Sequence, residues 1–193
     1  VASMVLVILV LVLADIPYER YYRSAEMLHL LLGPATVALA VPLFLHARRI
    51  RALLLPILLT LITGSVLTVG IAVGVLWLMG GSESSLLTIT TKSITTPIAM
   101  VVSEQLGGIA PLAAVIVMVT GALGAVVGIP IMEKLGFRDK AVQGVTLGLT
   151  AHAIGTTRAL EEDEECGAFA ALAMGTTGVL TALLLPIIVS WWR

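Results

Sequence analysis

Three long apolar segments without a charged residue constrain this chain most strongly. They cover residues 52–79, 109–132 and 168–192. Each is longer than the roughly 20 apolar residues that an α-helix needs to cross the hydrocarbon core of a bilayer. Charged residues make up 12% of the chain, whereas about 25% is usual for a soluble domain. The mean hydropathy is +1.08, so the sequence predicts an all-α polytopic membrane protein.

Further apolar segments complete the predicted architecture. Residues 1–14 form a run that is short for a span, and we interpret it as the remainder of a helix in an N-terminally truncated chain. Residues 29–45 form a second helix that Gly33, Pro34 and Pro42 interrupt. We therefore expect a single membrane domain over residues 1–193, with about five full transmembrane helices and two interrupted elements at 86–105 and 141–166.

An internal repeat relates the two interrupted elements. A shift of 60 residues, without a gap, places "LTITTKSITTPIAM" from Leu87 over "LGLTAHAIGTTRAL" from Leu147. The repeats cover residues 85–131 and 145–191. Matched pairs include Thr90/Thr150, Ile94/Ile154, Thr96/Thr156, Glu104/Glu164 and Gly107/Gly167. Interrupted segments at corresponding positions of two halves are typical of transporter binding sites.

Loop charges suggest how the repeats are oriented. The basic loop "HARRIR" at 46–51 and the loop "EKLGFRDK" at 133–140 are both expected in the cytoplasm by the positive-inside rule. The element at 86–105 then begins and ends outside, so it is re-entrant and the repeats are inverted. If both elements cross the membrane instead, the second loop lies outside and the repeats are parallel. We favour the inverted arrangement.

The first interrupted element has the features of an anion site. Pro97 suits the first turn of a half-helix, because a missing N–H costs nothing there. Thr95 or Thr96 would cap that helix, whose free N–H groups attract anions. Lys92 adds a positive charge that is costly at membrane depth unless it has a partner or a function. The alternative for Lys92 is an ion pair with Glu104.

The second interrupted element repeats this pattern. Gly155 is expected to supply the turn, and Thr156 or Thr157 the cap of the following half-helix. Arg158 suits bidentate binding of a carboxylate. The alternative is an ion pair of Arg158 with Glu161 or, at helical i,i+4 spacing, with Glu162.

Three further residues could carry protons. His152 aligns with Lys92 and titrates near neutral pH, although a packed, hydrogen-bonded histidine is the alternative. Glu104 and Glu164 could also carry protons, or could serve as helix caps or interface residues. The acidic run at 161–165 lacks the pattern of a calcium loop and fits a solvated helix end.

Composition and motifs exclude several classes of function. A net charge of −1 offers no basic face for nucleic acid. The single Cys166 allows neither an internal disulfide nor a cysteine metal cluster, and it fits a packing role. No catalytic motif is present. We therefore expect neither an enzyme, nor a metal site, nor a cofactor.

Three segments carry a resemblance to a known family. "LLGPATVALAVPL" (31–43), "TKSITTPIAM" (91–100) and "GLTAHAIGTTRALE" (148–161) resemble the LrgB/CidB family of bacterial membrane proteins. The resemblance covers the chain from about Ile16 to its end. It implies a multi-pass protein of the bacterial inner (plasma) membrane. It also implies antiholin-like control of murein hydrolase export and autolysis with a small holin-like partner, LrgA/CidA. A similar plastid protein translocates glycolate and glycerate, and bacterial relatives are linked to pyruvate uptake.

These observations predict a carrier, or a carrier subunit, for small monocarboxylates such as glycolate, glycerate, pyruvate or lactate. The alternative is a regulator of lysis that acts through the holin-like partner. Expected partners are the carboxylate, that small membrane protein, the lipid bilayer and further copies of the chain. The candidate substrate-binding residues are Lys92, Ser93, Thr95, Thr96, His152, Thr156, Thr157 and Arg158.

Overall fold

The computed structural model describes residues 2–17, 20–21, 34 and 37–192. It divides the chain into two compact units, residues 1–41 and 42–193. In the first unit, α1 (Ala2–Leu13) confirms a helix at the start of the chain. The predicted interruption at Gly33 and Pro34 lies partly outside the described residues. Pro42, the other predicted interruption, lies within the helix that ends this segment. The end of that apolar segment is helical, as α4 (Ala40–Leu45).

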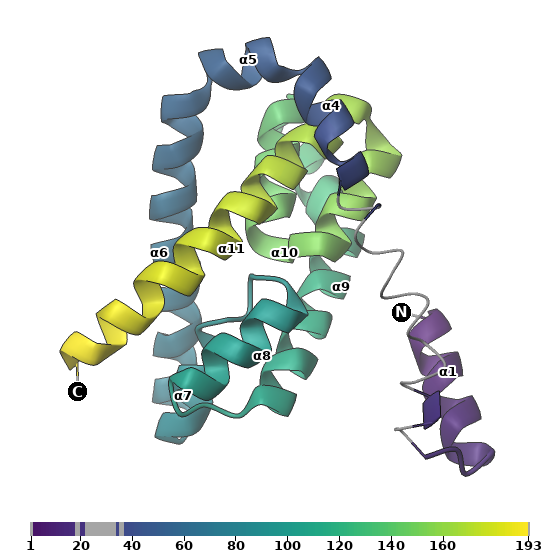
Figure 1. Ribbon diagram of the computed structural model, residues 1–193. Coiled ribbons are helices and arrows are strands. Elements are labelled where there is room, and N and C mark those ends of the chain that lie inside the picture. Colours follow the sequence, from purple (N-terminus) through teal and green to yellow (C-terminus); the bar gives the residue numbers. More distant parts are fainter. Residues whose placement is uncertain (1, 18–19, 22–33, 35–36, 193) are drawn as a thin grey trace. The chain divides into compact units, whose positions relative to one another are not determined.

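The second unit is built from helices of very different lengths (Figure 1). In chain order they are α5 (Ala47–Ala52), α6 (Leu54–Leu78), α7 (Glu83–Ile89), α8 (Thr96–Gln105), α9 (Ala110–Lys134), α10 (Lys140–Glu162) and α11 (Glu164–Trp192). No strand occurs in the described part of the chain.

The basic segment expected as a loop is largely the helix α5. Its alanines and arginines favour helix, and Ile50 is buried against the core that surrounds Phe169. The expectation of a loop was therefore wrong, because a buried apolar side chain anchors these residues as a helical turn.

Three helices in the described residues are long and apolar enough to cross a membrane. They are Leu54–Leu78, Ala110–Lys134 and Glu164–Trp191, and they coincide with the three charge-free segments. The expected count of about five spans is not confirmed. The helix α1 has only 12 residues, and residues 29–33 and 35–36 lie outside the described part.

The first interrupted element is broken where the sequence predicts. The helix α7 ends at Ile89, and α8 begins at Thr96 with Pro97 in its first turn. The backbone between them is non-helical. Thr95 occupies the N-cap position in an extended conformation, with φ −65° and ψ 143°.

The second break lies at His152 rather than at Gly155. His152 has φ 42° and ψ −132° and divides α10 into two half-helices. Gly155 lies inside the second half-helix. A Cβ at Gly155 would lie 2.6 Å from Cβ of Ala151 and 2.7 Å from the carbonyl oxygen of Leu147. Glycine is needed there for close approach of the two half-helices, and not for the turn itself.

Close backbone packing joins α10 to α11. A Cβ at Gly144 would lie 2.2 Å from the carbonyl oxygen of Cys166, and one at Gly148 would lie 2.2 Å from that of Ala170. Cys166 is buried and unpaired within the cluster of Ile129, Met132, Leu147, Ala159 and Ala170, as a packing residue should be. Small residues at helix contacts are typical of membrane proteins, where backbones can then approach closely.

Candidate functional site

The two breaks converge on the same part of α9. Ile94, from the first break, packs in a buried cluster with Ala113 and Val117 of α9. His152, at the second break, lies 2.9 Å through Nε2 from the carbonyl oxygen of Val117. Because a carbonyl can only accept, Nε2 carries the proton and donates this hydrogen bond. Figure 1 shows the α7–α8 pair and α10 on either side of the middle of this unit.

A glycine in α9 makes room for the His152 ring. A Cβ at Gly121 would lie 2.5 Å from Cε1 and 2.6 Å from Nε2 of His152. His152 is 2% exposed, so the ring is packed and hydrogen-bonded. This was one of the two alternatives that the sequence left open for His152, and the proton-carrying role stays a prediction.

Lys92 lies half-buried in the first break. Its Nζ is 3.1 Å from Oγ of Ser93, and Ser93 is 6% exposed. No acidic side chain among the described residues lies within 4.0 Å of this ammonium. In particular, Glu104 is exposed near the end of α8. The ion pair considered for Lys92 and Glu104 is therefore absent.

The N-terminus of α8 lies beside Lys92 in the sequence and has no side-chain cap. Thr95 occupies the N-cap position, but its hydroxyl makes no capping hydrogen bond. Thr95 and Thr96 are both partly exposed. The first N–H groups of a helix carry a partial positive charge. The backbone of α8 and the Lys92 ammonium thus place positive charge in one short segment.

The threonines of the second element do not cap a helix. Thr156 donates from Oγ1 to the carbonyl oxygen of His152 at 2.8 Å, and Thr157 donates to that of Ala153 at 3.1 Å. Both lie inside the second half-helix, so the expectation that one of them caps it was wrong. Thr156 is buried, with Sδ of Met174 at 3.6 Å, whereas Thr157 is exposed.

Arg158 forms the ion pairs that the sequence offered as the alternative. Its guanidinium lies 3.1 Å from Glu162 and 3.9 Å from Glu161. An open cavity of about 430 Å³ adjoins it, lined by Ala125, Val126, Ile154, Thr157, Arg158 and Glu161. The structure thus divides the candidate binding residues of the second interrupted element into two groups. Thr156 and His152 are buried, and Thr157 and Arg158 line this cavity.

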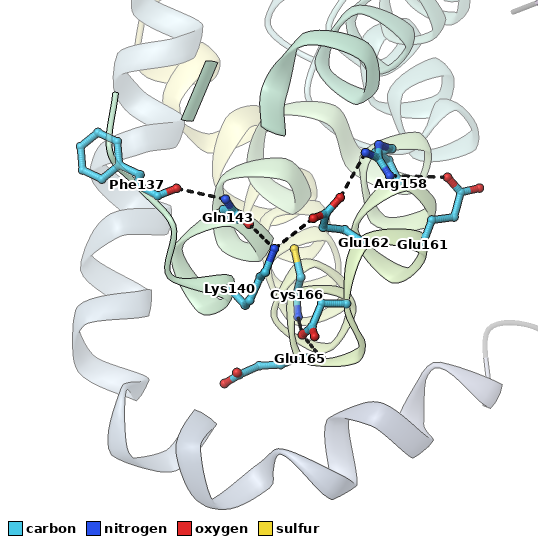
Figure 2. Close-up of polar contacts among 9 residues, drawn as sticks. Phe137, Lys140, Gln143, Arg158, Glu161, Glu162, Glu165 and Cys166 are labelled. Carbon is cyan, nitrogen blue, oxygen red and sulfur yellow. Dashed lines mark hydrogen bonds and ion pairs between the residues drawn. The ribbon is translucent and has the colours of Figure 1, made fainter. Parts of the chain in front are cut away.

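A polar cluster joins the two ends of α10, which sequence reasoning did not foresee (Figure 2). Nζ of Lys140 lies 3.0 Å from Glu162 and 3.2 Å from Oε1 of Gln143. The hydrogen bond that Lys140 donates to Glu162 raises the pKa of Lys140. The same bond from Lys140 lowers the pKa of Glu162. The only signal for this pair in the sequence was that Lys140 and Glu162 lie near opposite ends of the second interrupted element.

The acidic run caps α11 and contacts α5. Oδ1 of Asp163 accepts hydrogen bonds from the backbone N–H groups of Glu165 and Cys166. Arg49 of α5 lies 2.8 Å from Asp139 and also pairs with Glu165. Glu164 is exposed in the first turn of α11, where an acid favours the positive helix end.

Buried hydroxyls without a hydrogen-bond partner were also missed; among the described residues they are those of Ser65, Ser103 and Thr177. Thr177 of α11 is 2% exposed, and its Oγ1 has no hydrogen-bond partner in the described structure. Among the same residues, no three His, Cys, Asp or Glu side chains are close enough together to hold a metal ion.

Apolar helices able to span a bilayer, with two broken elements packed on one of them, define a helical membrane protein. Comparison with known proteins gives the particular family. The model of the LrgB-like family matches residues 1–191, and the chain belongs to this family.

Relatives match over nearly the whole chain. A holin-like protein CidB of Staphylococcus epidermidis is 31% identical over 183 residues, which cover 95% of this chain and 80% of the relative. An uncharacterized protein of Haemophilus influenzae is 34% identical, with coverages of 97% and 81%. The uncharacterized protein YwbG of Bacillus subtilis is 33% identical, with coverages of 94% and 80%. No solved structure matches the chain.

Proposed function

We propose that this chain is a carrier, or a carrier subunit, for small monocarboxylates in the bacterial inner membrane. The observation that carries the proposal is Lys92. Its ammonium lies half-buried in a break between two helices, and no acid pairs with it among the described residues. A charge held at such a site is costly unless it has a function. An anionic ligand would supply the missing partner.

The neighbouring backbone supports the same ligand. The α8 N-terminus adds partial positive charge, and the hydroxyls of Thr95 and Thr96 are partly exposed beside it. One ammonium with one helix end matches a single carboxylate better than a dicarboxylate. Glycolate, glycerate and pyruvate, the substrates that the family resemblance implies, fit this size and charge.

An inverted repeat would give the carrier its two states. In this arrangement α6, α9 and α11 cross the membrane, and the α7–α8 pair and α10 enter from opposite faces. The packing of α7 on α6 and α9, and of α10 on α9 and α11, supports it, as does the placement of the two elements in Figure 1. Movement of one broken element against the other would expose the site alternately to each side.

Uptake into proteoliposomes tests the proposal. The full-length protein would be reconstituted alone and with the small holin-like partner, and uptake of labelled glycolate and pyruvate would be measured. We expect saturable uptake that Lys92→Met reduces by about 10–100-fold. A correctly folded protein that takes up neither compound in either preparation would refute the carrier function.

The names of the relatives support a second function more directly. Several of them are named holin-like protein CidB, which favours control of lysis through a holin-like LrgA/CidA partner. In that case, deletion of the gene should change the rate of autolysis, and Lys92→Met should restore the normal rate as well as the unaltered protein does. The response to Lys92→Met therefore separates the two functions.

A further inference from the structure

Thr177 lies on the face of α11 that packs against α10. Cys166, Ala170, Ala173 and Thr177 recur at helical spacing and are all buried. The backbone at Cys166 and Ala170 contacts the first half of α10 at Gly144 and Gly148. The side chain of Thr177 therefore continues the same interior face, and its hydroxyl has no hydrogen-bond partner within the described chain.

Residues on either side of Thr177 contact the two broken elements. One turn before it, Met174 lies against Thr156, which follows the break in α10. One residue after it, a Cβ at Gly178 would lie 3.5 Å from Cδ1 of Ile98 in the first turn of α8. The neighbours of Thr177 on α11 thus contact the second half of α10 and the first turn of α8.

The internal repeat aligns Thr177 with Val117 of α9, whose backbone carbonyl contacts His152. A shift of 60 residues places Val117 over Thr177 and Lys92 over His152. On α9, the carbonyl oxygen of Val117 already accepts the hydrogen bond from His152. The residue at the equivalent position on α11, Thr177, carries a hydroxyl that has no hydrogen-bond partner within the described chain.

We propose that the Thr177 hydroxyl binds the oxygen on C2 of a 2-hydroxy or 2-oxo monocarboxylate whose carboxylate lies at Lys92 and the α8 N-terminus. This inference rests on the proposed carrier function. A buried hydroxyl without a partner is unfavourable, and a ligand oxygen removes that cost. A site built to hydrogen-bond such an oxygen rejects an analogue that lacks it. The carrier should therefore prefer glycolate to acetate and lactate to propionate.

The test measures this preference in the full-length protein. Uptake of labelled glycolate and of labelled acetate would be compared for the unaltered protein and for Thr177→Val, which keeps the shape and removes the hydroxyl. We expect the glycolate-to-acetate ratio of kcat/KM to fall about ten-fold, the size of one lost hydrogen bond. Acetate uptake should stay unchanged, because it does not use this group.

Two matched variants complete the design. Thr177→Ser keeps the hydroxyl and should keep the ratio. Thr176→Val removes a hydroxyl from the preceding residue of α11. Thr176 is only partly buried, so this variant should also leave the glycolate-to-acetate ratio unchanged. An unchanged ratio in Thr177→Val, or an equal loss in Thr176→Val, would overturn the role of Thr177 and leave the carrier function intact. Absence of all uptake by the unaltered protein would instead overturn the carrier function, and this inference with it.

Discussion

His152 is tied to Val117 by a hydrogen bond of 2.9 Å from its ring Nε2 to a backbone carbonyl oxygen of α9. The donor interrupts α10 with a positive φ, a conformation that a residue other than glycine adopts only when its surroundings hold it there. The acceptor belongs to the same buried cluster as Ile94 from the other break. Through this one contact region, α9 links both interrupted elements.

Gly121→Ala should destabilise the protein, because the added methyl would overlap the His152 ring at 2.5 Å. Overpacking of this kind costs about 1–3 kcal/mol, measured as a lower thermal midpoint in detergent. Gly70→Ala is the matched control, since a Cβ at Gly70 meets nothing within 4 Å. Equal midpoints for the two variants would show that the ring does not occupy this position.

Lys92→Met should reduce carboxylate uptake by about 10–100-fold, the effect of losing a charged hydrogen bond to the ligand. Stability should not fall, since the lysine has no acidic partner to lose in the described chain. Arg158→Met is the control and should retain uptake, because its guanidinium is engaged by Glu161 and Glu162. Loss of uptake in Arg158→Met alone would reverse these assignments.

The Lys140–Glu162 pair should make stability depend on pH at both extremes. The lowered pKa of Glu162 means that its contribution is present above the ordinary value of 4.5 and is lost as pH falls through the lowered value. The raised pKa of Lys140 means that its contribution is present below 10.5 and is lost as pH rises through the raised value. Glu162→Gln should remove about 1 kcal/mol at neutral pH and flatten the loss of stability in acid. Thermal midpoints measured against pH check this, with exposed Glu164→Gln as the control.

Accessibility of single cysteines tests the inverted arrangement. Ser82→Cys and Gln105→Cys flank the α7–α8 pair, so both should react with an impermeant maleimide from the same side of the membrane. Arg138→Cys should react from the opposite side. The native Cys166 is fully buried and should stay unlabelled. Reaction of Ser82→Cys and Gln105→Cys from opposite sides would show that this element crosses the membrane.

Local patterns in the sequence were sufficient to predict the three long apolar helices and the first break. Charge-free runs of spanning length gave the three long helices, and Pro97 marked the start of α8. The second break was misplaced because Gly155 was interpreted through its conformational freedom. The structure uses Gly155 for its small size. A glycine in a sequence does not reveal which of these two properties is needed.

Contacts between distant residues could not be predicted in the same way. The sequence offered an ion pair or a ligand for both Lys92 and Arg158. The structure pairs Arg158 with Glu162, whereas no acid among the described residues pairs with Lys92. The i,i+4 spacing of Arg158 and Glu162 on a helix made their ion pair predictable. The outcome for Lys92 depended on where Glu104 lies relative to the break, which is a property of the tertiary fold. Thr177 was missed for the same reason, because an unpartnered hydroxyl is visible only once its neighbours are placed.

An ion pair joins Lys140 and Glu162 at the two ends of α10. It ties the start of the first half-helix to the end of the second, on the far side of the turn at His152. This pair opposes separation of the two half-helices. The paired ends of α10 are joined to α5 through Arg49, which pairs with the neighbouring Asp139 and Glu165. A displacement of the turn at His152 would therefore reach α5 through Arg49.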